Sequence, residues 1–220
     1  MKRNEILKRI LVWLIGITVL QIGVALFLSL RLGSDAFTVF TQGIASKLAI
    51  SPGTANRLLT FVFLGIIFIL DRKQIRIGTF LAIVSTGIIL DGILKLIEPF
   101  NIENYHVIAR MVILIAACII ICIGFPILKS SELGVAPNDL IYLGIMKKLK
   151  KSYTSIRMSI DGLYLIFGGI LGGVIGIGTI VCLGLLGPLM DMFFPKIESL
   201  VSAFIDTSQE SNEKVPNNHI

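Results

Sequence analysis

The chain has 220 residues, of which 55% are hydrophobic and 15% are charged, and its formal net charge is +6. A soluble domain carries about 25% charged and about 45–50% apolar residues, so this composition excludes an ordinary water-soluble globular protein. The mean hydropathy is +0.88, and the apolar residues form long continuous runs, which favours membrane-spanning helices over strands that alternate in polarity.

Six apolar runs are predicted to cross a membrane as helices. The first stands where a signal peptide would, but its apolar stretch exceeds the roughly 7–15 residues of a signal-peptide core, so we expect a spanning helix there. The six predicted spans are Ile10–Leu30, Ala55–Leu70, Ile77–Ile97, Tyr105–Leu128, Ser155–Leu171 and Val174–Phe194.

Two further segments, 32–54 and 133–154, each begin with Leu-Gly and are predicted to contain a short helix, over Phe37–Ala49 and Asn138–Lys150. The stretch Asn138–Met146 would reach only about 14 Å as a helix, far less than a bilayer requires. We therefore expect both short helices to be interfacial or re-entrant. Each segment ends at a threonine, Thr54 or Thr154, which we expect to cap the following helix.

The two halves of the chain repeat one another about 100 positions apart. Three predicted crossings per half give the second copy the opposite orientation, so we expect two inverted three-helix repeats, as in many secondary transporters. The predicted units are residues 1–104, residues 105–196 and an amphipathic, then disordered, cytoplasmic tail at 197–220. The matching positions are Leu32-Gly33 with Leu133-Gly134, Gly43 with Gly144, Arg57 with Arg157, Gly78-Thr79 with Gly178-Thr179, Gly87 with Gly187, and Asp91 with Asp191.

Basic residues lie beside the apolar runs in a biased way. With the N-terminus in the cytoplasm, all but five of the 20 Lys and Arg residues fall on the inner side. The positive-inside rule therefore predicts a multi-pass protein with both termini cytoplasmic. The same rule explains the net positive charge without a nucleic-acid partner. The five exceptions are Arg31, Lys47, Arg57, Lys95 and Arg110.

The motifs "LGSDAF" and "LGVAPNDL", together with "IGTxxxxxxxGxxxD" near the end of each half, resemble the YczE/YyaS/YitT-type bacterial integral membrane proteins. The first half departs from the pattern, because Ser34-Asp35-Ala36 replaces a proline-containing turn. The soluble C-terminal domain of YitT-type members has no counterpart here, so the YczE-like branch fits better. The resemblance implies a bacterial cytoplasmic-membrane protein and carries over no established set of catalytic residues.

Four acids are the candidate substrate-binding residues: Asp35, Asp91, Asp139 and Asp191. Ionisable residues inside a membrane tend to be functional, and N-termini of broken helices often face a central site in transporters. Two structural interpretations stay open. Asp35 and Asp139 could cap or begin the short helices, and Asp91 and Asp191 could be helix-end residues near the interface.

Glycines and one charged pair favour packing roles. Small residues spaced by four let helix backbones approach closely. Arg157 is expected to pair with Asp161 one turn along its helix, or to extend toward the interface. The cysteines read as small packing residues. The glycines predicted to serve packing are Gly78, Gly87, Gly168, Gly172, Gly178 and Gly187.

Two functions are consistent with this sequence. The first is a small-solute transporter with a site between inverted repeats, which we expect to be oligomeric. The alternative is a non-transporting membrane protein that binds or regulates a partner protein. The chain contains no H-E-x-x-H, G-x-S-x-G or phosphate-binding loop motif. We therefore expect no enzymatic activity, cofactor or metal, and a lipid bilayer as the surrounding medium.

Overall fold

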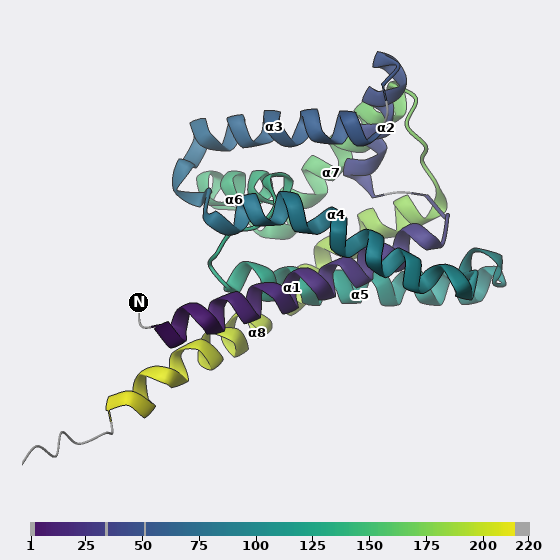
Figure 1. The fold of residues 1–220 in the computed structure, drawn as a ribbon. Coiled ribbons are helices and arrows are strands. Elements are labelled where there is room, and N and C mark those ends of the chain that lie inside the picture. The colour runs from purple at the N-terminus through teal and green to yellow at the C-terminus, as the bar shows by residue number, and fades with distance from the viewer. Residues whose placement is uncertain (1–2, 34, 51, 214–220) are drawn as a thin grey trace, which may run out of the picture.

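The computed structural model describes residues 3–33, 35–50 and 52–213, and this part of the chain is helical throughout, without strands. Eight α-helices are joined by short turns and single-turn 3-10 helices (Figure 1). Their bounds are α1 Arg3–Ser29, α2 Ala36–Leu48, α3 Pro52–Asp71, α4 Ile77–Ile97, α5 Val107–Ser130, α6 Pro137–Leu149, α7 Tyr153–Ile170 and α8 Ile177–Glu213.

Within the described residues, five stretches are long and apolar enough to cross a membrane: Glu5–Ser29, Thr54–Gln74, Ile77–Phe100, Val107–Ser130 and Ile177–Ile205. These agree with five of the six predicted spans. Helix α7, which replaces the predicted span Ser155–Leu171, has 18 residues and is not among the five. The two short helices α2 and α6 have 13 residues each, which confirms the prediction that they are too short to cross.

Two boundaries were predicted wrongly. Helix α8 does not end at Phe194 but continues through Pro195, and Lys8 of α1 donates a hydrogen bond to the Phe204 carbonyl at 2.8 Å. The expected cap at Thr154 is also absent. Ser152 caps α7 instead, accepting the Ser155 N–H at 3.3 Å, because a serine two residues upstream was already available at the helix start.

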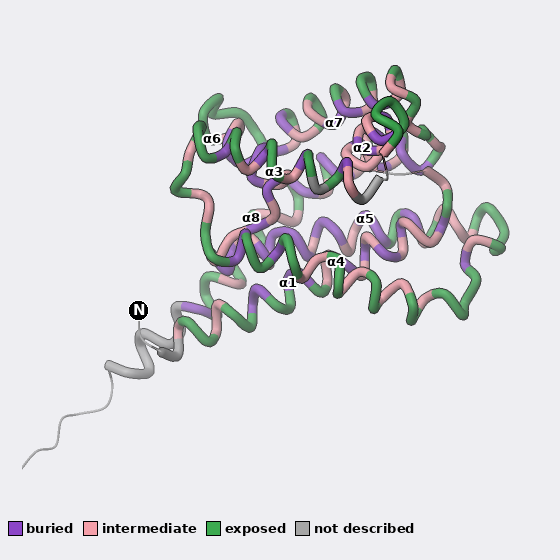
Figure 2. Tube along the Cα trace, turned by 45° about the horizontal axis from the view of Figure 1, so that its top comes forward, coloured by how far each residue is buried: buried purple, intermediate pink, exposed green. Residues whose placement is uncertain are grey.

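The helices form two layers. Helices α1, α4, α5 and α8 make the lower layer of Figure 1, and α2, α3, α6 and α7 make the upper one. Within the lower layer the backbones of α1 and α5 lie so close together that a Cβ added at Gly16 or Gly124 would collide with the facing backbone. Figure 2 shows buried stretches along the inner sides of α1 and α5, whereas α3 and α4 are largely exposed.

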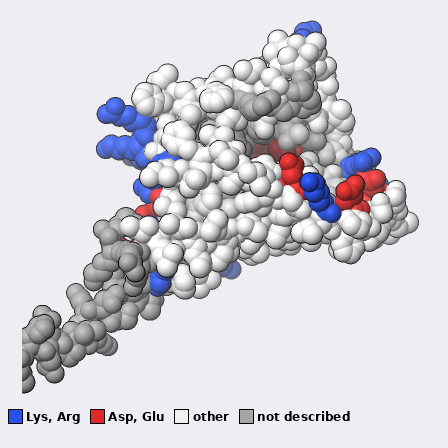
Figure 3. Space-filling view, in the orientation of Figure 1, with Lys and Arg blue, Asp and Glu red and all other residues white. Residues whose placement is uncertain are grey.

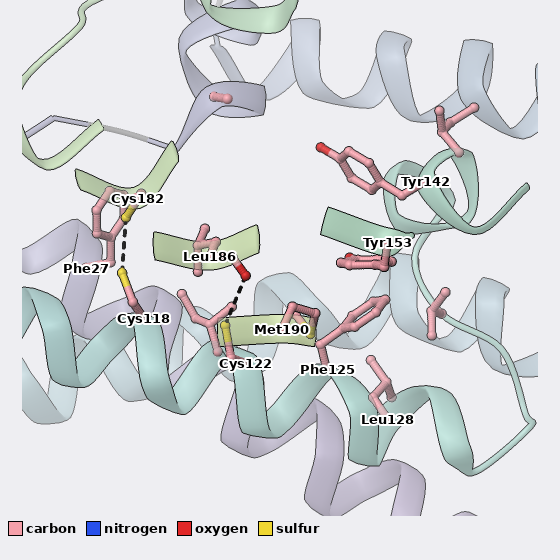
Figure 4. Close-up of a cluster of buried hydrophobic side chains, with 14 of the residues drawn as sticks. Phe27, Cys118, Cys122, Phe125, Leu128, Tyr142, Tyr153, Cys182, Leu186 and Met190 are labelled. Atoms are coloured by element: carbon pink, nitrogen blue, oxygen red, sulfur yellow. Dashed lines mark hydrogen bonds between the residues drawn. The ribbon is translucent and has the colours of Figure 1, made fainter. Parts of the chain in front are cut away.

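The core between α5, α7 and α8 is apolar and contains the three cysteines, all buried and free (Figure 4). The Cys118 and Cys182 sulfurs are 3.3 Å apart, and Cys122 points its thiol at the Leu186 carbonyl. The rings of Phe125 and Tyr153 contact each other at a tilt, with ring centroids 5.7 Å apart. The interpretation of the cysteines as packing residues is confirmed.

The two halves interlock through the repeated motifs. The Gly178 N–H donates to the Leu32 carbonyl at 2.8 Å, and the Gly78 N–H donates to the Leu133 carbonyl, also at 2.8 Å. Each Leu-Gly turn therefore binds the helix start of the opposite half. Such a contact buries polar backbone groups with their partners in place.

Thr79 and Thr179 complete this interlock and are almost fully buried. The Thr79 hydroxyl accepts the Arg76 N–H at 3.4 Å, and the Thr179 hydroxyl accepts the Gly176 N–H at 3.3 Å. Sequence comparison of the halves showed the motifs but not that they contact each other.

Candidate functional site

A polar cavity of about 40 Å³ lies where the first turns of α2 and α6 meet α7 and α8. Space of this size holds about three water molecules. Most of its polar lining comes from charged or hydroxylated side chains, while Phe37 and Leu186 contribute apolar walls. The polar residues that line it are Asp35, Asn138, Asp139, Tyr142, Arg157 and Asp161.

The two short helices present their N-terminal ends to this cavity in different ways. Asp35 is the N-cap of α2, and its carboxylate accepts the Thr38 N–H at 3.2 Å and the Thr38 hydroxyl. Helix α6 starts at Pro137 without a side-chain cap, and Asp139 lies in its first turn. The predicted capping and first-turn positions of these two acids are confirmed. Asp35 is thus engaged by its own helix, whereas Asp139 is not.

Arg157 is the positive charge of the site. Its Nε lies 3.3 Å from the Asp161 carboxylate, and its Nη1 donates to the Tyr153 hydroxyl at 2.9 Å. The Tyr142 hydroxyl donates to the other Asp161 oxygen at 2.6 Å. The guanidinium also lies 5.2 Å from the Tyr142 ring centroid. Asp161 is only 6% exposed, so this network is held inside the protein rather than at its surface.

The expected pairing of Arg157 with Asp161 is therefore confirmed. Both side chains are buried in the cavity wall, which favours the ion pair over the alternative that Arg157 extends toward the interface. A buried ion pair is favourable only when further hydrogen bonds satisfy its members. Tyr142 donates one to Asp161 and Tyr153 accepts one from Arg157, whereas the Arg157 Nε makes no hydrogen bond within the described part of the chain. The side chain of its sequence counterpart, Arg57, lies outside the described residues.

Asp139 carries the open functional group of the cavity. Among the described residues, no donor makes a hydrogen bond to its carboxylate. Burial raises the pKa of the Asp139 carboxyl, and the Arg157 guanidinium opposes that shift. Three acids surround one base, so the cavity is electronegative when all are ionised. Such a site favours a proton, a small cation or a solute with a positively charged group.

A family model described as "Family of unknown function (DUF6198)" matches residues 7–195. The chain belongs to this family. The match includes residues of all eight helices.

Three relatives of this family member are similar over almost their full lengths. YyaS of Bacillus subtilis, an uncharacterized protein, is 29% identical over 84% of this chain and 91% of its own. An uncharacterized protein of Haemophilus influenzae is 25% identical over 88% of this chain and 86% of its own. The uncharacterized membrane protein YczE of Bacillus subtilis is 22% identical over 91% and 92%. No solved structure matches. The similarity to YyaS and YczE confirms the resemblance seen in the repeated motifs. The name of the YczE relative and the long apolar helices together support a helical membrane protein.

The structure brings together two of the four predicted acids. Asp35 and Asp139 line the cavity, whereas Asp91 and Asp191 are exposed and outside its lining. Asp191 accepts the Thr154 N–H at 3.3 Å and so supports the contact between α8 and α7. The sequence did not predict Tyr142 and Asp161 as residues of the site. The spacing of Arg157 and Asp161 showed that they could pair but not where the pair lies.

The six predicted packing glycines differ in their surroundings. An added Cβ would lie 2.7 Å from Leu133 at Gly78, 3.1 Å from Leu32 at Gly178, 2.9 Å from Thr154 at Gly187 and 2.7 Å from Phe40 at Gly168. Gly172 has a positive φ and looser contacts, and Gly87 has no neighbouring atom within 4 Å.

The part of the chain that the structure describes contains no group of three His, Cys, Asp or Glu residues able to hold a metal ion.

Proposed function

We propose that the protein is a small-solute permease of the bacterial cytoplasmic membrane whose site is the cavity between α2 and α6. The observation that carries this proposal is the meeting of two short helices, one from each half, at a buried cluster of Asp35, Asp139, Arg157 and Asp161. Helix starts that converge on charged residues inside the protein are a recurring way for transporters to bind solutes. Charged residues buried inside a membrane protein are costly and tend to serve its function.

The proposed architecture is a three-plus-three inverted repeat. Helices α1, α3 and α4 form the first set, α5, α7 and α8 form the second, and α2 and α6 are re-entrant. Reciprocal hydrogen bonds of Gly78 with Leu133 and Gly178 with Leu32 support this plan. Helix α7 has 18 residues and would extend about 27 Å, close to the roughly 30 Å hydrocarbon layer. The charge bias supports cytoplasmic termini.

The proposed solute is small and carries a positive charge. Acids outnumber bases in the cavity, and the Asp139 carboxylate is the group without a hydrogen-bond donor among the described residues. The volume of about 40 Å³ fits an occluded site that encloses only a cation or the charged end of a solute. A larger solute would require the helices around the site to separate.

The halves also differ in conformation, which supports alternating access. In the second half Gly187 packs against Met158 and Thr154, and the Thr154 hydroxyl donates to the Gly187 carbonyl at 2.6 Å. In the first half the equivalent Gly87 has no atom within 4 Å, and Leu58, equivalent to Met158, is exposed. We propose that transport exchanges these two arrangements.

One observation favours the alternative of a non-transporting membrane protein that binds or regulates a partner. The cavity is small, and a static charged cluster could serve packing specificity alone. Helices α3 and α4 are largely exposed, and their surfaces are available to bind further copies of the chain or a partner protein. A binding experiment separates these functions.

Replacing Asp139 by asparagine should remove solute binding while keeping the fold, because the amide matches the carboxylate in size but not in charge. We expect monovalent cations, primary amines or quaternary amines to raise the unfolding midpoint of the purified protein by about 3 °C or more. The Asp139→Asn variant should lose this response, and the matched Asp91→Asn variant should keep it. An equal response in Asp139→Asn and the wild type would place binding elsewhere.

A further inference from the structure

A second, larger pocket of about 320 Å³ lies away from the central cavity. It is formed by the turn between α3 and α4, the end of α5, one side of α6 and the C-terminal part of α8. Figure 3 shows Lys and Arg side chains gathered beside the α3–α4 turn, and a separate group of charges of both signs toward the opposite end of the same face. Pockets of this size commonly hold small molecules.

The rim of the pocket carries charges of both signs. Lys147 pairs with Asp71 at 2.9 Å, and Lys129 pairs with Glu198 at 2.5 Å. Lys73 is exposed and pairs with no acid in the described part of the chain. Arg76 also lines the pocket, and its guanidinium lies 3.8 Å from the Glu132 carboxylate. The rim therefore offers Lys73 as an uncommitted positive charge and Arg76 as a weakly paired one, beside lysines and carboxylates that hold one another in place.

The floor of the pocket is apolar. Val135, Leu140 and Leu143 line it and are buried. Ser130, which also lines it, is 8% exposed, and its hydroxyl has no hydrogen-bond partner. A charged rim above an apolar floor fits an amphiphilic ligand better than a free inorganic ion.

The charges of the α3–α4 turn are not repeated in the equivalent turn of the second half. Residues 71–76 read "DRKQIR", whereas the equivalent turn at 171–176 reads "LGGVIG" and has no charge. The pocket also lies where three candidate spans begin or end, at Gln74, Ile77 and Ser130. Lipid headgroups meet a membrane protein at that level.

We propose that this pocket binds a ligand that carries both a phosphate and a free ammonium group, as in phosphoethanolamine. Lys73 and Arg76 would bind the phosphate oxygens, and Asp71 and Glu198 would accept hydrogen bonds from the ammonium. The ligand could be the headgroup of a membrane phospholipid or a soluble phosphate ester. In the first case the acyl chains extend along the apolar surface of the helices.

The test compares the unfolding midpoint of the full-length protein in detergent with added phosphatidylethanolamine, phosphatidylcholine, phosphatidylglycerol, soluble phosphoethanolamine and inorganic phosphate. We expect phosphatidylethanolamine to raise the midpoint by about 3 °C or more. Phosphatidylcholine lacks ammonium N–H donors and phosphatidylglycerol lacks the ammonium, so both should act weakly. An equal response to soluble phosphoethanolamine supports the pocket and identifies the soluble ester as the source.

Two variants tie the response to the pocket. Lys73→Glu should abolish it without changing the unliganded midpoint, because Lys73 is exposed and unpaired. Ser202→Trp should fill the space without removing an ion pair. The matched control Lys47→Glu changes an exposed lysine outside the pocket and should respond like the wild type. Equal shifts from all three lipids, or an unchanged response in both pocket variants, would overturn the proposal.

Discussion

Replacing Arg157 by methionine is expected to lower the free energy of unfolding by about 3–5 kcal/mol. The guanidinium pairs with Asp161 at 3.3 Å and donates to the Tyr153 hydroxyl at 2.9 Å. Its removal leaves Asp161 and the nearby Asp139 without their closest positive charge. An unpaired charge in a buried position costs much more than the ion pair itself contributes.

Reversible denaturant unfolding of the purified protein in detergent measures this loss. Lys95→Met, which removes an exposed base on α4, is the control and should change stability by less than about 1 kcal/mol. The double variant Arg157→Met/Asp161→Asn should recover part of the loss, because the orphaned carboxylate is removed as well. If Arg157→Met were as stable as Lys95→Met, the buried network would have no role in stability.

Replacing either Gly33 or Gly134 by alanine is expected to destabilise the protein by about 2–4 kcal/mol. Both glycines have a positive φ, 129° and 123°, which L-residues rarely adopt. An added Cβ would also lie 2.6 Å from the Thr179 hydroxyl at Gly33 and 2.7 Å from the Thr79 hydroxyl at Gly134. Strain and collision therefore act together at the interlock between the halves.

The control for these variants is Gly65→Ala on α3, where no atom lies within 4 Å of the added Cβ. Alanine is the better helix former, so this variant should be as stable as the wild type or slightly more stable. Unfolding of all three variants under one set of conditions gives the comparison. Wild-type stability for Gly33→Ala and Gly134→Ala would mean that the two turns are not fixed by their partners.

The sequence predicted the elements of the fold well because they depend on local properties. Continuous apolar runs predict spanning helices, and a short helix between Leu-Gly and a basic segment predicted α6 within one residue at each end. The end of α8 was harder, since Pro195 is normally a stop signal but here lies inside a continuing helix. Packing of its C-terminal part against α1 is a long-range contact that no local pattern contains.

The residues of the site could be predicted only in part, because the site also depends on long-range packing. Asp35 and Asp139 share the cavity because both begin short helices that converge, and the helix-start pattern was visible in the sequence. Asp91 and Asp191 were visible as a repeated pair, but whether an acid near a helix end faces inward depends on helix rotation. Tyr142 reaches Asp161 across two helices, a contact that only the folded arrangement reveals.

Alternating access is the central claim, and cross-linking of paired cysteines in native membranes tests it most directly. In a variant without Cys118, Cys122 and Cys182, one pair replaces Met158 and Gly187, which are in contact in this structure. The matched pair replaces Leu58 and Gly87, the equivalent positions in the open first half. We predict that each pair cross-links when introduced alone, and that a variant with all four cysteines forms one bond or the other in a given molecule. Cross-linking of the Met158–Gly187 pair alone, with the Leu58–Gly87 pair never forming, would contradict the account and favour a static membrane protein.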